Sequence, residues 1–323
     1  MDSLENRTDL SLFAEKIGAI RTELKKYIVG QEKVVDELII ALIADGHVLI
    51  EGVPGLAKTL LARLLAKIVD VKFKRIQFTP DLLPSDIIGT SIFNMQESKF
   101  HFNKGPLFSN IILADEINRS PAKTQAALFE AMEEKQITVD GKTHKLNYPF
   151  LVLATQNPVD MEGTYRLPEA QIDRFLFKIT INYPNLEEEK EILSRHHSRN
   201  GNVNIKDVNK ILFKKDLDSI KETIGKIQVE DSMLEYIAKI VTKTRNNPDL
   251  FLPASPRASL SLLSSSKVFA AINGRDFVTP DDIKFVLSPT LRHRLILSPD
   301  KELEGSTVDD VINELIKSVE IPR

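Results

Sequence analysis

The sequence contains no cysteine and no tryptophan, and aromatic residues make up only 7% of its 323 positions. Without cysteine the chain forms no disulfide bond and offers no thiolate ligand to a metal ion. Lysine and arginine nearly balance aspartate and glutamate, so the formal net charge is only −3. This balance excludes a strong overall attraction to nucleic acid or to an acidic membrane surface.

Long apolar runs are also missing. The longest, Leu38–Ala44, is far too short to span a bilayer. The segment Met1–Leu12 is polar and charged, and it lacks the apolar stretch of a secretory signal. We therefore expect a cytoplasmic protein with no membrane partner. The length allows two domains, and a hydrophobic content of 42% is ordinary for a globular protein.

The most informative segment is Glu51–Thr59, which reads EGVPGLAKT. It follows a short apolar run that predicts a buried strand, and apolar residues at helical spacing come after it. In a strand–loop–helix of this kind, backbone N–H groups and the helix N-terminus surround a polyphosphate. The lysine reaches the β- and γ-phosphates, and the hydroxyl of the next residue binds Mg²⁺. The segment therefore predicts a site for a nucleoside triphosphate such as ATP, formed by Gly52, Val53, Pro54, Gly55, Leu56, Ala57, Lys58, Thr59 and Leu60.

Ala57 departs from the usual pattern G-x-x-x-x-G-K-[ST], because it stands where a second glycine is expected. Alanine favours the helix that begins there, so the change is tolerable if Ala57 has helical dihedral angles. Upstream, the segment Tyr27–Gln31 interrupts two amphipathic helical stretches. Its residues Val29 and Gly30 could cover the adenine of a bound nucleotide, and a simple turn between two helices fits the spacing equally well.

The rest of the chain divides into two halves. Apolar runs at 71–78, 111–116, 150–155 and 175–181 predict further strands, and they alternate with helical patterns. This alternation predicts an α/β fold with a parallel sheet covered on both faces. Two hairpins are expected at 91–103 and 136–146. After Tyr183–Asn185 the pattern is helical throughout, so we predict an α/β domain at 1–183 and an all-helical domain at 184–323.

Two acids, Asp115 and Glu116, end the apolar run at 111–116. The carboxyl ends of parallel strands collect ligands at one edge of the sheet, where the phosphate loop is also expected. There, Asp115 would join Thr59 in holding Mg²⁺, and Glu116 would orient or deprotonate the attacking water. Asn157 follows the neighbouring strand, where its amide could hydrogen-bond the γ-phosphate or the water.

Two arginines are further candidates. Arg174 lies just before the last strand of the first half, where it could serve a phosphate or could simply pair with Asp173 or Glu169. Arg257 follows Ser255-Pro256 and so falls in the first turn of a predicted helix. A cation there opposes the helix dipole, which suggests that Arg257 serves an anion such as a bound phosphate.

The ordered motifs GVPGLAKT, ILADEINRS, ATQNP, EAQIDRF and ASPRASL resemble those of the MoxR family of AAA+ ATPases. The resemblance covers nearly the whole chain. It implies a phosphate-loop AAA+ core with a C-terminal helical lid, assembled into a hexameric ring. By position it assigns the phosphate-loop pair to Lys58 and Thr59, the metal and catalytic acids to Asp115 and Glu116, the first sensor to Asn157, the arginine finger to Arg174 and the second sensor to Arg257.

The resemblance also implies a chaperone-like activity. Relatives of this kind mature other proteins or insert their cofactors, often with a partner that carries a von Willebrand factor A domain, and their two hairpins line the pore of the ring. Other activities stay open from the sequence alone. A nucleic-acid translocase is less expected but fits the basic residues Lys142, His144 and Lys145 of the second hairpin. A metal-chelatase-type motor subunit and a scaffold that binds nucleotide without hydrolysing it are further alternatives.

Overall fold

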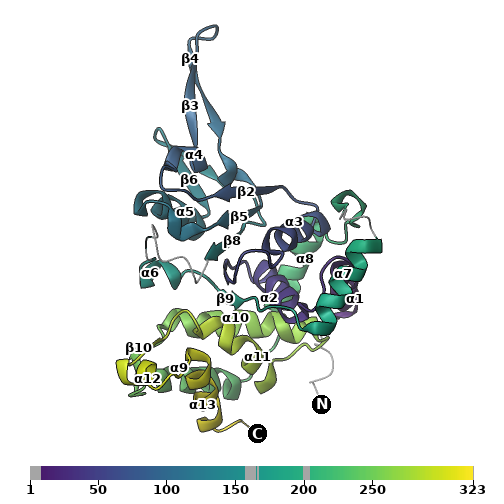
Figure 1. The fold of residues 1–323 in the computed structure, drawn as a ribbon, viewed down its shortest axis with the longest axis vertical. Coiled ribbons are helices and arrows are strands. Elements are labelled where there is room, and N and C mark those ends of the chain that lie inside the picture. Colours follow the sequence, from purple (N-terminus) through teal and green to yellow (C-terminus); the bar gives the residue numbers. More distant parts are fainter. Residues whose placement is uncertain (1–8, 157–164, 166, 199–203, 323) are drawn as a thin grey trace.

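A five-stranded parallel sheet forms the centre of the molecule (Figure 1). The computed structural model describes residues 9–156, 165, 167–198 and 204–322. The strands lie in the order β2-β5-β8-β1-β9, so the first strand is second from one edge. Their bounds are β1 Val48–Glu51, β2 Phe73–Gln77, β5 Ile111–Asp115, β8 Leu151–Gln156 and β9 Phe177–Thr180. The predicted parallel sheet is confirmed.

The inner strands are apolar along their length because both of their faces are covered. In β5, Ile111 and Leu113 belong to one hydrophobic core, and Ile112 and Ala114 belong to the other. The first core contains α1 Ser11–Lys25, α2 Glu32–Ile43 and α3 Lys58–Ile68, and the second contains α5 Ala122–Glu134. The sheet therefore separates two cores that helices cover from opposite sides.

Two antiparallel hairpins extend from the sheet. The first pairs β3 Gly89–Asn94 with β4 Lys99–Lys104 and projects far from the rest of the molecule (Figure 1). The second pairs β6 Gln136–Val139 with β7 Lys142–Lys145. Both hairpins lie where the sequence pattern places them. A short helix that the sequence did not reveal, α4 Pro84–Ile88, leads into the first.

The C-terminal half is mainly helical, rather than helical throughout as predicted. Its helices are α7 Leu186–Ser198, α8 Lys214–Gly225, α9 Asp231–Arg245, α10 Pro256–Ile272, α11 Pro280–Leu291, α12 Pro299–Leu303 and α13 Val308–Ser318. One antiparallel strand pair also occurs there, β10 Leu250–Leu252 with β11 Ile296–Leu297. The remaining short elements are α6 Glu169–Ile172 and the 3-10 helices Pro106–Phe108, Ile117–Arg119 and Ile205–Asp207.

The helices after 184 occupy two places. Helices α9 to α13 lie together below the sheet, whereas α7 and α8 lie beside α1 and α3 (Figure 1). Residues of α8, α10 and α11 share one continuous hydrophobic core with α1 and α2. The division into domains at 183/184 stays a prediction. In the described part of the chain, no helix combines the length and the apolar character that a membrane span requires.

Candidate active site

The loop between β1 and α3 has the close backbone packing expected of a phosphate loop. At Gly52, an added Cβ would lie 3.0 Å from the carbonyl oxygen of Ile181, so the chain leaves little room there for a side chain. Gly55 has a φ of +91°, which glycine adopts without strain. Lys58 is the first residue of α3, and its Nζ donates a 2.6 Å hydrogen bond to the Gly52 carbonyl. Burial lowers the pKa of Lys58, and the nearby Asp115 and Glu116 partly offset that shift.

Ala57 does not meet the condition of right-handed helical dihedral angles. Ala57 is the N-cap of α3 and has φ 54° and ψ 18°, in the left-handed region rather than the right-handed helical one. For an L-residue this conformation costs about 1–2 kcal/mol. The backbone therefore keeps the conformation that a glycine would favour, although the residue is alanine.

The two acids lie at the carboxyl edge of the sheet, as the strand pattern predicted. Asp115 ends β5, and its Oδ1 accepts a 2.6 Å hydrogen bond from the Thr155 hydroxyl on β8. The backbone N–H of Glu116 donates to the same hydroxyl oxygen at 2.9 Å. Glu116 also has a left-handed backbone, with φ 56°. Thr155 thus links the backbone of one acid to the side chain of the other.

Two further side chains, Arg75 and Gln77, reach these acids from β2, and neither was predicted from the sequence. Arg75 donates from Nε and Nη2 to Asp115 Oδ2, at 3.0 and 2.6 Å. Gln77 donates from Nε2 to Glu116 Oε2 at 2.9 Å. The two residues are two apart on the strand, on either side of the buried Ile76. This alternation of polar and buried positions on a strand was the available signal.

These groups line one cavity of about 430 Å³. The cavity contains loop and helix residues from Pro54 to Leu60, together with Arg75, Gln77, Asp115, Glu116 and Thr155. Thr59 and Asp115 therefore present a hydroxyl and a carboxylate oxygen to the same space. Mg²⁺ prefers oxygen ligands and takes few of them from a protein when phosphates supply the others. Among the described residues no cluster of three acids or histidines could hold a metal by itself, so the residues present fit Mg²⁺ bound together with a nucleotide.

An apolar cavity of about 440 Å³ adjoins this one and shares the loop residues from Pro54 to Ala57 and Leu60 with it. Tyr27, Ile28, Val29 and Tyr183 line its other sides. Val29 therefore lines an apolar cavity beside the phosphate loop, and its role over the base of a nucleotide stays a prediction. Gly30 lines a neighbouring cavity instead, at a φ of +71° and so close to the Glu188 carboxylate that a Cβ would clash with it.

The two predicted arginines lie together, away from the loop. Among the described residues that line the two cavities, neither Arg174 nor Arg257 is found. Both approach Glu133 near the end of α5. Arg257 Nη2 lies 2.9 Å from Glu133 Oε1, and Arg174 Nη1 lies 3.4 Å from Oε2. Arg174 Nη1 also donates to the Phe129 carbonyl at 3.0 Å. The remaining candidate, Asn157, lies outside the described residues.

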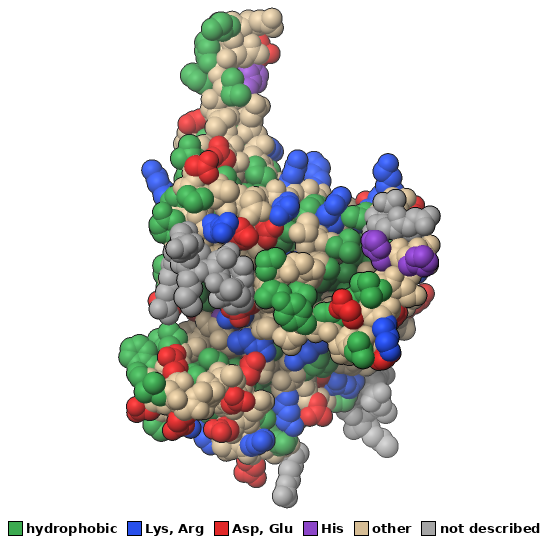
Figure 2. Space-filling model, in the orientation of Figure 1, with side chains coloured by type: hydrophobic (Ala, Val, Ile, Leu, Met, Phe, Trp, Pro, Cys, Tyr) green, Lys and Arg blue, Asp and Glu red, His purple; other side chains and the backbone are tan. Residues whose placement is uncertain are grey.

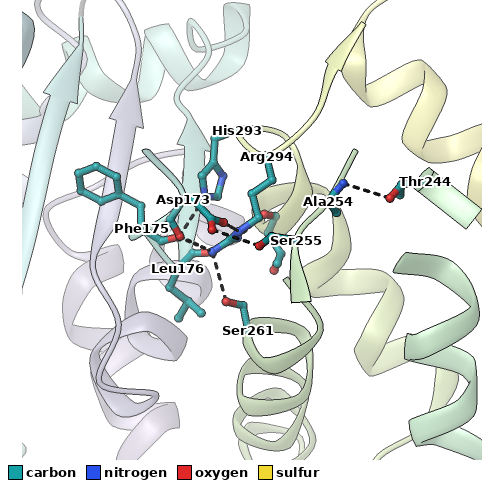
Figure 3. Close-up of polar contacts among 10 residues, drawn as sticks. Asp173, Phe175, Leu176, Thr244, Ala254, Ser255, Ser261, His293 and Arg294 are labelled. Atoms are coloured by element: carbon teal, nitrogen blue, oxygen red, sulfur yellow. Dashed lines mark hydrogen bonds and ion pairs between the residues drawn. The ribbon is translucent and has the colours of Figure 1, made fainter. Parts of the chain in front are cut away.

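The position of Arg174 is tied to the C-terminal helices through its neighbour Asp173 (Figure 3). The Asp173 carboxylate accepts a 2.7 Å bond from Arg294 Nε and a 3.1 Å bond from the Ser255 hydroxyl. Arg294 is only 4% exposed and also donates to the carbonyls of Phe175 and Leu176. Ser255 is the N-cap of α10, two residues before Arg257. One set of contacts therefore positions both arginines.

Comparisons with known proteins agree with this geometry. Residues 47–177 match the ATPase family associated with various cellular activities (AAA), and residues 242–315 match the AAA lid domain. The chain is 44% identical to the uncharacterised protein YeaC of Bacillus subtilis, over 95% of each chain. It is 43% identical to the chaperone MoxR1 of Mycobacterium tuberculosis, over 93% of this chain and 81% of the relative.

A crystal structure of a provisionally assigned ATPase from Cytophaga hutchinsonii is also similar. Its TM-score is 0.89 at 46% sequence identity, and the match covers 96% of both chains. The sheet order, the helical lid and these relatives agree with one another. The chain belongs to the MoxR family of AAA+ ATPases.

Proposed function

We propose that this protein is a Mg²⁺-dependent ATPase whose hydrolysis cycle drives a chaperone-like action on a partner protein. The observation that supports it most strongly is the convergence of Lys58, Thr59, Asp115 and Glu116 on one cavity at the carboxyl edge of the sheet. These are the groups that phosphoryl transfer to water requires: a cation for the phosphates, two oxygen ligands for the metal and a carboxylate for the water.

The residues would divide the work as follows. Lys58 leaves the Gly52 carbonyl and contacts the β- and γ-phosphates. Thr59 and Asp115 would hold Mg²⁺, which screens the phosphate charge when bound. Glu116 accepts a proton from the attacking water. The oxygen of that water bonds to the γ-phosphorus, and the bond between the γ-phosphorus and the β,γ-bridging oxygen breaks. The products are ADP and inorganic phosphate.

We further propose that the site is shared between subunits of a ring, with a hexamer as the expected size. Arg174 and Arg257 lie together at Glu133, outside the cavities beside the loop of their own chain. An arginine that meets the developing charge accelerates phosphoryl transfer strongly. Their shared location supports a role for both on the nucleotide of a neighbouring subunit. Arg257, which the family resemblance assigns as the second sensor, would then also contact the nucleotide of the neighbouring subunit.

The first hairpin supports a protein client. Ile92, Phe93, Met95 and Phe100 on and near its tip are 48–87% exposed, and hydrophobic side chains line this projection in Figure 2. Contiguous exposed apolar groups mark sites of interaction with other proteins, whereas contact with nucleic acid depends mainly on positive charge. In the second hairpin, the His144 ring stacks on Phe102 at 4.9 Å between centroids, which occupies a ring that could otherwise stack on a base. A partner with a von Willebrand factor A domain and a cytoplasmic location remain part of the same proposal.

The test is phosphate release from Mg²⁺·ATP by the purified protein. We expect turnover by the unaltered chain and none by Lys58→Ala, which should also lose tight ATP binding by calorimetry. Arg63→Ala is the matched control, because Arg63 is an exposed cation on the same helix outside the cavity. Native ATP affinity in Lys58→Ala would contradict the assignment of the loop. A filter-binding assay with a salt titration tests the translocase alternative, since phosphate contacts produce a steep salt dependence.

A further inference from the structure

Arg75 holds the one carboxylate that the proposed ATPase needs for its metal. The Asp115 carboxylate has its Oδ1 engaged by Thr155, and its Oδ2 accepts two N–H bonds from Arg75. The Asp115 side chain is 14% exposed, whereas that of Arg75 is 49% exposed. A largely buried carboxylate requires a compensating charge, and a guanidinium on the neighbouring strand supplies it here.

The Arg75 guanidinium is also connected, through Gln77, to Glu116, the proposed general base. Arg75 Nη2 donates to Gln77 Oε1 at 2.8 Å, and Gln77 Nε2 donates to Glu116 Oε2 at 2.9 Å. The Gln77 amide is therefore held at both ends, with its oxygen toward Arg75 and its nitrogen toward Glu116. The same Glu116 oxygen lies 3.4 Å from Arg119 Nη1, so both an amide and a guanidinium approach it.

We propose that Arg75 is the counter-cation of Asp115 in the nucleotide-free site, and that Mg²⁺ must displace it when it arrives with a nucleotide. The inference rests on the proposed function. A guanidinium and a divalent cation repel each other across the same carboxylate oxygen. Arg75 thus raises the Mg²⁺ concentration that the site requires.

The experiment measures Mg²⁺ binding rather than turnover. A fluorescent ADP analogue is bound to the protein, and its affinity is followed as free Mg²⁺ is varied, with an EDTA arm as the metal-free reference. In Arg75→Gln we expect the half-saturating Mg²⁺ concentration to fall by about three- to tenfold, the range for removal of a partly screened charge. Affinity in EDTA should change far less.

Four further variants make the result specific. Arg75→Ala removes the charge in a second way and should give the same fall. Arg75→Lys restores a cation and should return the half-saturating Mg²⁺ concentration toward the native value. Gln77→Ala leaves the pair of Arg75 and Asp115 in place, so its Mg²⁺ requirement for binding should stay native. Lys74→Gln is the matched control, because Lys74 is exposed on the same strand and does not line the cavity.

An unchanged or higher half-saturating Mg²⁺ concentration in both Arg75→Gln and Arg75→Ala would overturn the inference. Failure of the proposed function has a different signature, because the unaltered protein would then bind the ADP analogue neither in EDTA nor with Mg²⁺. An equal shift in Lys74→Gln would show that any lost positive charge on β2 has this effect, which would also overturn the specific role of Arg75.

Discussion

Asp173 and Arg294 are 121 residues apart in the sequence and form a 2.7 Å ion pair that joins the sheet domain to the C-terminal helices. Figure 3 shows the Arg294 guanidinium surrounded by acceptors from both parts. Besides the carboxylate it reaches the carbonyls of Phe175 and Leu176 and the hydroxyl of Ser261. Because Asp173 precedes Arg174, this contact links the placement of the lid to the placement of a proposed catalytic arginine.

Replacing Arg294 with alanine should destabilise the protein markedly. The change leaves several buried carbonyls and one carboxylate without their donor, and breaking a buried pair from one side costs about 3–5 kcal/mol. Equilibrium unfolding in urea measures the loss. Arg245→Ala serves as the control, since Arg245 is exposed and donates to one carbonyl at 3.3 Å. A loss below about 1 kcal/mol for Arg294→Ala, similar to that of the control, would show that the contact contributes little.

Glu116→Gln should bind ATP with native affinity and lose turnover. Asp115 and Thr59 keep the metal ligands, but the neutral amide cannot accept a proton from water. Loss of a general base lowers kcat by about 10²–10⁴-fold. Calorimetry gives the affinity and phosphate release gives the rate. Undiminished hydrolysis in Glu116→Gln would show that another residue is the general base.

Arg174→Ala should reduce hydrolysis by about 10³–10⁵-fold with little change in ATP affinity, the usual contribution of an arginine finger. Arg174→Lys should rescue poorly, because an ammonium cannot reproduce the planar guanidinium fork. Arg257→Ala should also reduce the rate of hydrolysis, since both arginines contact Glu133.

Mixing tests whether these arginines act across subunits. Inactive Arg174→Ala and inactive Lys58→Ala chains should regain part of the activity together, because an intact arginine can then face an intact phosphate loop. Native mass spectrometry first establishes that mixed assemblies form. Mixed assemblies that remain inactive would exclude a site shared between neighbours.

Ala57→Gly should stabilise the nucleotide-free protein, by about 0.5–1 kcal/mol. Relief of the left-handed strain is worth about 1–2 kcal/mol, and the greater flexibility of glycine in the unfolded chain removes part of that gain. The matched control is Ala126→Gly, at an exposed position inside α5, which should cost about 1 kcal/mol. Urea unfolding of both variants gives the comparison, and a loss of stability in Ala57→Gly would contradict the assigned backbone conformation.

His47 should make stability fall in acid. Its Nδ1 accepts from the Val152 N–H and its Nε2 lies 3.2 Å from the Met132 carbonyl, so the buried ring is held neutral. Burial lowers the pKa of His47 from 6.5 to about 4. Between those values the unfolded chain binds the extra proton. The contribution of His47 to the free energy of unfolding is therefore fully present above pH 6.5 and falls by about 3 kcal/mol as the pH drops toward 4.

The measurement is the free energy of unfolding from pH 4 to 8 for the native chain and for His47→Gln. Burial also raises the pKa of Glu37 to about 7. That group acts in the opposite direction, because its contribution is present below pH 4.5 and is lost as the pH rises through 7. Glu37 is present in both proteins and cancels in the difference. An equal pH dependence in the two proteins would exclude His47 as the cause.

Several features follow from local sequence alone. An apolar strand that ends in Asp115 and Glu116 places these acids at the edge of a parallel sheet whatever its neighbours are. The loop from Gly52 to Thr59 is likewise a local pattern, since glycine spacing and the start of a helix are properties of adjacent residues. These patterns were enough to predict the fold class. They were also enough to predict that Lys58, Thr59, Asp115 and Glu116 meet in one cavity.

Tertiary packing decided the rest. Arg75 and Gln77 reach the acids because β2 pairs with β5, with Gln77 opposite Asp115. The sequence of a strand does not show which other strand will lie beside it in the sheet. Arg257 lies beside Arg174 because α10 packs against the sheet domain through Ser255 and Asp173. The left-handed turn at Ala57 likewise opposes the intrinsic preference of alanine. For Arg75, Gln77 and Arg257 the deciding contacts join segments that are distant in the sequence, and such contacts exist only once the chain has folded.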